Sequence, residues 1–257
     1  MRWQAVGASV QGTSHAAEGL PCQDAHAIAH VGDGVVAAVC DGAGSSPYAA
    51  LGASVGAESV VQALAASCRD ARSRFRSPHP DAWLEAGRKA VVHARGAIAR
   101  ALAAELALGS ALAVDLGLAH TTLVAVAAGP DGGALFHIGD GFAAVLAPEG
   151  ATVSRPENGN FANETYFFTE ASWSPHLRVT PFPRPVESVW LLSDGAAALA
   201  TSDGALVAGF ARPVSAFLRS ATPEAAQAGL HGTLASASTD HLTDDDKTIV
   251  WAAPLAP

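Results

Sequence analysis

Short apolar runs separated by turn residues extend along most of the chain, and this pattern predicts β-strands. The runs cover residues 3–9, 25–31, 35–40, 121–128, 134–138, 143–146, 188–192 and 248–252. Turn residues join several neighbouring runs: Gly32-Asp33-Gly34, Pro130-Asp131-Gly132-Gly133 and Asp140-Gly141. Connections this short predict antiparallel hairpins.

A different pattern fills residues 47–107 and predicts a helical insertion between the third and fourth strands. Its first half, about 48–68, is apolar almost all round, which predicts a buried helix. Its second half is amphipathic, with Asp81 as the expected N-cap, and is suited to covering one face of a sheet. The arginine-rich link at 69–76 is expected to be a solvated loop without a function of its own.

The remaining segments complete the predicted fold. Residues 149–185 show few strand signals but many turn residues and aromatics, so they predict a flap beside a cleft. Two helices, 214–220 and 223–235, are expected before the last strand. This order favours the α+β class, with two packed antiparallel sheets and helices outside, in a single domain spanning residues 1–257.

Composition narrows the classes of partner and compartment. The formal charge of −9, with lysine only at Lys89 and Lys247, argues against a nucleic-acid partner. The three cysteines form no Cys-x-x-Cys pair, so neither a disulfide framework nor structural zinc is expected. No leader-like N-terminus and no uninterrupted run of eighteen apolar residues is present. We therefore expect a cytoplasmic protein without a membrane partner.

Five apolar runs finish on an aspartate, and these residues are the candidate chemistry of the chain. The runs read Pro21-Cys22-Gln23-Asp24, Val39-Cys40-Asp41-Gly42, Ile138-Gly139-Asp140-Gly141, Leu192-Ser193-Asp194-Gly195 and Thr243-Asp244-Asp245-Asp246. Carboxylates at strand ends can point into one cleft, where they repel one another unless a cation is bound. Oxygen ligands favour Mg²⁺ or Mn²⁺. Taken singly, each aspartate is better explained as a turn, surface or capping residue.

The ordered set of motifs resembles the metal-dependent type 2C protein phosphatases, the PPM family. The motifs are Gln23-Asp24, Cys40-Asp41-Gly42, Thr121-Thr122, His137-Ile138-Gly139-Asp140, Leu192-Ser193-Asp194-Gly195 and Asp244-Asp245-Asp246-Lys247-Thr248. Three further segments are similar to a bacterial branch of that family: Ser14-His15, Pro21-Cys22-Gln23-Asp24 and Ala162-Asn163-Glu164-Thr165. The likeness spans nearly the whole chain.

This resemblance implies a four-layer α-β-β-α sandwich holding two Mn²⁺ or Mg²⁺ ions, with a possible third. It also implies hydrolysis of phosphoserine or phosphothreonine by a metal-bridging hydroxide. The expected substrate is a phosphorylated protein, the product of a bacterial serine/threonine kinase. The thiols of Cys22 and Cys40, which lack a Cys-x₅-Arg phosphate loop, are expected to be small buried groups and not nucleophiles.

The resemblance also assigns metal-site positions, which are Asp24, Asp41, Gly42, Asp140, Asp194 and Asp245. Asp41 would bridge the two ions and the Gly42 carbonyl would bind the second. Asp194 and Asp245 would hold the first ion, with Asp246 or Asp244 as alternatives to Asp245. Asp24 would ligate or orient metal-bound water, and Asp140, with Asp194, would hold a weaker third ion. The catalytic set would be Asp24, Asp41, Asp194 and Asp245.

Three positions depart from the family pattern. Gly19 stands where an arginine often holds the phosphate, so His15 or an arginine from elsewhere would substitute as the substrate-binding group. Gln23 replaces a glutamate, and Ala43 replaces a histidine proposed as general acid in some members. These departures keep two alternatives open: a non-catalytic phosphoprotein-binding pseudophosphatase, and a small-molecule phosphoesterase with the same metal centre.

Overall fold

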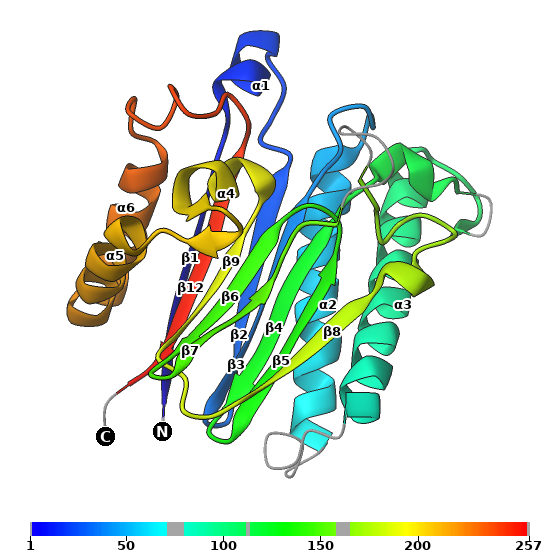
Figure 1. Ribbon diagram of the computed structural model, residues 1–257. Coiled ribbons are helices and arrows are strands. Elements are labelled where there is room, and N and C mark those ends of the chain that lie inside the picture. The colour runs from blue at the N-terminus through cyan, green and yellow to red at the C-terminus, as the bar shows by residue number, and fades with distance from the viewer. Residues whose placement is uncertain (1, 71–79, 112–113, 158–164, 256–257) are drawn as a thin grey trace.

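The protein, described by a computed structural model over residues 2–70, 80–111, 114–157 and 165–255, is built on two five-stranded antiparallel sheets (Figure 1). Sheet I has the order β1 (Trp3–Val10), β12 (Lys247–Pro254), β9 (Ser188–Leu192), β6 (Phe142–Ala147) and β7 (Gly150–Ser154). Sheet II has the order β2 (Asp24–Val31), β3 (Gly34–Asp41), β4 (Leu123–Gly129), β5 (Gly132–Ile138) and β8 (Arg178–Pro183).

Helices cover the outer faces of both sheets. The helices α2 (Ala49–Asp70) and α3 (Pro80–Glu105) lie over sheet II, whereas α5 (Ala208–Ser220) and α6 (Pro223–Leu234) lie beside sheet I (Figure 1). Three apolar clusters fill the interfaces between these layers, and the cluster between the sheets includes Val39, Val124 and Leu191. The predicted α+β fold with two packed antiparallel sheets flanked by helices is therefore confirmed.

The helix α2 explains why the first half of the insertion is apolar on every face. Within the described residues it is the single helix long and apolar enough to cross a membrane by length and composition. Ala57, Val60 and Leu64 of this helix are instead fully buried in the cluster shared with sheet II and α3. Packing on two sides, against a sheet and a second helix, requires apolar residues around most of its circumference.

The connection at Asp140-Gly141 is not the hairpin predicted from its turn residues. The strands it joins, β5 and β6, belong to different sheets, so this turn carries the chain from sheet II to sheet I. Gly139 adopts a φ of +108°, a conformation that favours glycine. A Cβ on Gly141 would lie 2.5 Å from Val124 Cγ2. The glycines here permit a tight crossing between sheets, and their turn chemistry is indistinguishable from that of a hairpin.

The predicted flap at 149–185 contains two edge strands, β7 and β8, one on each sheet. The strand β8 carries two prolines, which edge strands tolerate and which hide it from the sequence pattern. Residues 158–164, which include Ala162 to Glu164, lie outside the described part of the chain.

Helix boundaries differ from the predictions at several places. The helix α3 begins at Pro80, so Asp81 lies in its first turn and is not the N-cap. The helix α5 begins at Ala208 and continues through Pro213, which hid its first half from the sequence pattern. Two short helices, α1 (Thr13–Glu18) and α4 (Asp194–Ala200), and a small hairpin of β10 (Thr201–Ser202) and β11 (Ala205–Leu206), were not predicted. Arg72, Arg74 and Arg76 lie outside the described residues.

Candidate metal centre

Both sheets deliver aspartates to the same end of the sandwich. Asp24 begins β2 and Asp41 ends β3, and the antiparallel register pairs the two residues directly. Asp140 follows β5 at the crossing between sheets, and Asp194 follows β9 as the first residue of α4. Asp245 precedes β12. The five predicted strand-end positions therefore come together from segments far apart in the sequence.

Three of these carboxylates form a close cluster. One oxygen from each of Asp41, Asp140 and Asp194 lies within 4.8 Å of the others. They line a cleft of about 330 Å³ that Asp245 also lines, together with His15, Gly42 and other residues. Asp24 is 6% exposed and does not line this cleft. Of the five predicted strand-end aspartates, four therefore line the cleft, and the fifth, Asp24, is buried outside it.

Backbone hydrogen bonds fix Asp41 in place. Thr122 N donates to the Asp41 carbonyl at 2.8 Å, Thr121 Oγ1 donates to the same oxygen at 2.9 Å, and Asp41 N donates to Thr122 Oγ1 at 3.2 Å. Gly42 follows at a point with no room for a side chain, since a Cβ there would lie 2.7 Å from the Ala49 carbonyl oxygen. The strand end is therefore rigid, as a preorganised ligand position requires.

The turn that presents Asp194 is locked to the start of β12. Ser193 N donates to the Thr248 carbonyl at 3.0 Å, and Thr248 N donates to Ser193 Oγ at 2.9 Å. Gly195 lies so close to this segment that a Cβ on it would be 2.2 Å from the Asp246 carbonyl oxygen. Asp194 and Asp245 are thus held side by side by one interlocked unit.

Burial and mutual repulsion raise the pKa of all five carboxyl groups. Desolvation is the largest cause in each case. It raises the pKa of Asp24 to about 8, against an opposing effect of hydrogen bonds from Ser193 and Thr248. It raises the pKa of Asp194 to about 6 and that of Asp41 well above its usual range, where the charges of Asp24 and Asp194 add to the effect. A bound cation would relieve this penalty.

Two orphaned oxygens show that the site fits such a cation. Asp24 Oδ2 and Asp140 Oδ1 are buried and have no hydrogen-bond partner among the described residues. Buried polar atoms rarely lack a hydrogen-bond partner unless an ion or a water molecule binds to them. The donors gathered here are carboxylate oxygens with the Gly42 backbone beside them, a set that matches Mg²⁺ or Mn²⁺.

The third aspartate of the Asp244-Asp245-Asp246 run has a different environment. Asp246 is buried and accepts hydrogen bonds from Gly12 N at 2.6 Å, Gln23 N at 2.5 Å and His15 Nδ1 at 2.9 Å. Its oxygens are therefore committed to protein donors, whereas Asp245 and the exposed Asp244 line the cleft. This geometry favours Asp245 over Asp246 as the cleft ligand.

The segment after residue 165 supplies cleft residues that sequence reasoning missed. Thr165 and Phe167 line the cleft. Phe167 stacks on His120 with ring centroids 4.8 Å apart, and Arg95 of α3 donates to the Phe168 carbonyl oxygen at 2.8 Å. These contacts are irregular and tertiary, so no periodic signal in the sequence could have revealed them.

The two cysteines beside the aspartates are unsuited to nucleophilic catalysis. Burial raises the pKa of Cys22 to about 12 and raises that of Cys40 further. Because the thiolate is the reactive form, both thiols are inert at neutral pH. The expectation of a small buried group is confirmed for Cys40, whereas Cys22 is only half-buried.

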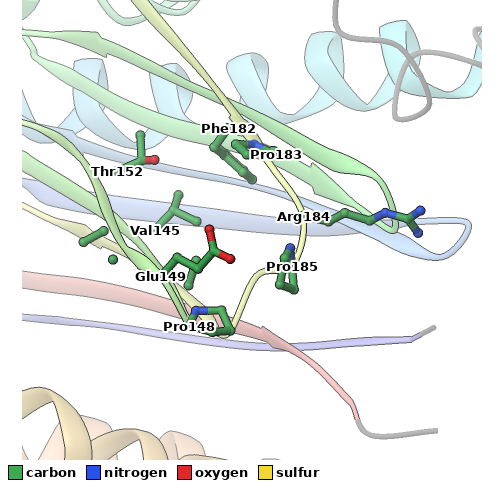
Figure 2. Close-up of a pocket in the computed structure, with 11 residues that line it drawn as sticks. Val145, Pro148, Glu149, Thr152, Phe182, Pro183, Arg184 and Pro185 are labelled. Atoms are coloured by element: carbon green, nitrogen blue, oxygen red, sulfur yellow. The ribbon is translucent and has the colours of Figure 1, made fainter.

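A second cavity, of about 280 Å³, lies at the opposite end of the strands, between the β6–β7 turn and β8 (Figure 2). Val145, Pro148 and Pro185 form part of its wall (Figure 2). The charged side chains in its lining are Glu149 and Arg184, and Arg184 pairs with Asp131 at 3.5 Å. This cavity contains no group of acids, so the candidate chemistry belongs to the first cleft.

Comparisons with known proteins identify the family of this chain. A family model described as Protein phosphatase 2C matches residues 11–235. Serine/threonine-protein phosphatase 3 of Escherichia coli (strain K12) is 28% identical over 263 residues, covering 98% of each chain.

Solved structures with the same fold include the phosphatase Stp1 from Staphylococcus aureus, with a TM-score of 0.60 at 16% identity, covering 98% of this chain and 95% of that one. The catalytic domain of the phosphatase PstP, in complex with two manganese ions, has a TM-score of 0.58 at 18% identity, covering 99% of both chains. The family model covers most of the chain, and the chain belongs to the protein phosphatase 2C family.

Proposed function

We propose that this protein is a Mn²⁺- or Mg²⁺-dependent phosphatase that hydrolyses phosphoserine or phosphothreonine in a partner protein. The observation that carries the proposal is the cluster of Asp41, Asp140 and Asp194 within 4.8 Å, beside two orphaned buried carboxylate oxygens. Family membership supports the reaction class, and the E. coli relative is named a serine/threonine-protein phosphatase.

Each residue of the centre has a distinct part in this proposal. Asp41, with the Gly42 carbonyl beside it, would stand between two cations, with Asp194 and Asp245 on one of them and Asp140 on an optional third. Divalent cations bound here would activate water at neutral pH and offset the charge of the phosphoryl group. Asp24, behind Asp41, would accept a hydrogen bond from a water molecule through its free Oδ2.

The rest of the chain holds this geometry and excludes competing chemistry. Thr121 and Thr122 fix the backbone of Asp41, so the carboxylate does not need to reorganise when substrate arrives. The neighbouring thiols stay protonated, and a phosphocysteine intermediate is therefore not expected. Direct attack of water on phosphorus, without a covalent phosphoenzyme, is the route that these residues favour.

The test is release of inorganic phosphate from a phosphothreonine peptide in Mn²⁺ and in EDTA. We expect turnover in Mn²⁺ alone, with a loss of about 1000-fold or more in Asp41→Asn and Asp194→Asn, since each removes several kcal/mol of transition-state stabilisation. Asp203→Asn, an exposed substitution, is the matched control and should leave activity unchanged. Undiminished turnover in the two cleft variants would contradict the proposal.

The departures at Gly19, Gln23 and Ala43 motivate a second candidate, a phosphoprotein-binding module without turnover. Calorimetry separates the two, because tight phosphopeptide binding with no phosphate release in Mn²⁺ would favour the module. A small-molecule phosphoesterase would instead show a much higher kcat/KM on a metabolite than on any phosphopeptide.

A further inference from the structure

The residue that the proposed metal centre leaves unused is His15, on the short helix α1. Its side chain is 14% exposed and lines the cleft with Asp41 and Asp194. The helix is joined to the Asp244-to-Asp246 segment, because both Ser14 N and Ser14 Oγ donate to the Asp244 carbonyl, at 3.0 and 2.8 Å. The imidazole is therefore held at the cleft wall by a segment that also presents Asp245.

One nitrogen of the ring is committed to Asp246. The Asp246 carboxylate already accepts from Gly12 N and Gln23 N, and backbone N–H groups can only donate. The third contact joins His15 Nδ1 and Asp246 Oδ2 at 2.9 Å, and because a carboxylate oxygen accepts hydrogen bonds, we assign Nδ1–H as the donor. This bond fixes the orientation of the ring and leaves Nε2 for a ligand.

The free nitrogen faces the glycine loop at the rim of the cleft. A Cβ built on Gly44 would lie 3.8 Å from His15 Nε2 and 4.0 Å from Gln23 Oε1. Gln23 Oε1 is itself buried and has no hydrogen-bond partner among the described residues. A ring nitrogen and an unsatisfied acceptor thus border the same space, which a side chain at position 44 would begin to fill.

The charges around the cleft indicate which ligand His15 Nε2 would bind. Among the described residues that line the cleft, five are aspartates and His15 is the single side chain able to carry positive charge. A phosphate that enters needs donors for the oxygens that do not face cations. His15 Nε2 borders the cleft on the side of the Gly44 loop, where it can reach such an oxygen while Nδ1 stays bound to Asp246.

We propose that His15, oriented by Asp246, binds an oxygen of the substrate phosphate through Nε2–H. This inference rests on the proposed function, which it deepens by naming the phosphate-holding side chain. His15 would contact the substrate, whereas Asp246 would be a positioning residue that acts through it. The rival explanation is structural: the pair would do no more than fasten α1 to the start of β12.

The kinetic test compares His15→Ala and His15→Gln with the wild type, and uses Glu18→Gln, an exposed change on the same helix, as control. Both a phosphothreonine peptide and p-nitrophenyl phosphate are used as substrates in Mn²⁺. We expect His15→Ala to raise KM for both by about 10- to 100-fold, the range for a hydrogen bond to a charged group. His15→Gln, which keeps an N–H near the Nε2 position, should recover most of this loss.

Two results in this assay would overturn the inference. An unchanged KM in His15→Ala for both substrates would leave the pair with a structural role. A loss of kcat confined to the phosphothreonine peptide, whose leaving alkoxide needs a proton more than p-nitrophenolate does, would make His15 a proton donor instead of a phosphate holder.

A binding measurement keeps this inference separate from the proposed function. Inorganic phosphate is titrated into the Mn²⁺-loaded protein by calorimetry, and His15→Ala is expected to weaken its affinity by about 10-fold or more while Glu18→Gln does not. If the wild type binds phosphate through His15 but releases none from substrates, the proposed function fails and the phosphate site stands. Equal affinities in wild type and His15→Ala would overturn the site.

The positioning role of Asp246 has its own readout. In ¹⁵N NMR spectra of the metal-free protein, His15 should show a protonated Nδ1 in the wild type. Asp246→Asn should alter that signal and raise KM in the same direction as His15→Ala, with thermal melting used to confirm that the variant is folded. A folded Asp246→Asn protein with an unchanged His15 signal and KM would contradict the orienting role.

Discussion

Replacing Asp24 with asparagine should stabilise the metal-free protein at neutral pH and reduce its pH dependence. The Asp24 side chain is almost fully buried with one oxygen unpaired, and desolvation raises its pKa to about 8 from an ordinary 3.8. Its folded-state pKa therefore lies above its unfolded-state value. The stability it contributes is fully present below about pH 4 and is lost as the pH rises through 8.

The size of the effect follows from proton linkage. Between the two pKa values, the folded state holds a proton that the unfolded state has released, which costs about 1.4 kcal/mol per pH unit. From pH 5 to pH 7 this amounts to about 3 kcal/mol. Asparagine stays neutral and can still accept the hydrogen bonds from Ser193 and Thr248, so Asp24→Asn should remove this part of the slope.

Urea unfolding in EDTA at pH 5, 6, 7 and 8 measures the difference directly. The free energy of unfolding of Asp24→Asn should fall less steeply with pH than that of the wild type, and the variant should be the more stable protein at pH 7. Asp203→Asn, exposed in a turn, is the control and should follow the wild type. Parallel slopes for Asp24→Asn and wild type would refute the reasoning that burial of this carboxyl dominates.

Two other substitutions test the supports of the site. Gly195→Ala should destabilise the protein by about 1 to 3 kcal/mol and weaken Mn²⁺ binding, since its Cβ would meet the Asp246 carbonyl oxygen at 2.2 Å; unchanged thermal melting would contradict this. Asp240→Asn should lower the free energy of unfolding by about 1 to 3 kcal/mol, because Asp240 is the charged partner, 2.7 Å away, of the fully buried Lys247. Urea unfolding measures this change. An unchanged free energy of unfolding would show that the hydrogen bond from Lys247 to Thr239 is sufficient.

The sequence was most informative where local chemistry and tertiary position coincide. An apolar run ending in Asp41-Gly42 predicted a strand-end carboxylate, and the turn at Gly32 to Gly34 predicted the hairpin that pairs Asp24 with Asp41. The two-sheet fold followed from strand and helix periods in the same way. In these segments the local sequence pattern is compatible with only one secondary structure and connection.

Sequence prediction is limited where one local signal has two structural solutions. The turn at Asp140-Gly141 has hairpin chemistry but crosses between sheets, which depends on strand pairing many residues away. The choice of Asp245 as the ligand stays a prediction, because Asp244, Asp245 and Asp246 have nearly identical local sequence. The donors from Gly12, His15 and Gln23 set Asp246 apart. Those donors belong to the other end of the chain, so no local pattern could reveal them.

The most direct test of the central claim is a crystal structure of the protein grown with Mn²⁺ and examined by anomalous scattering at the manganese edge. The account predicts anomalous peaks within coordination distance of Asp41 and Asp194, with Asp245 as a further ligand and Asp246 still bound to its three N–H donors. A cleft without manganese under saturating conditions, or manganese bound elsewhere in the molecule, would contradict the assignment of this acidic cluster as the catalytic metal centre.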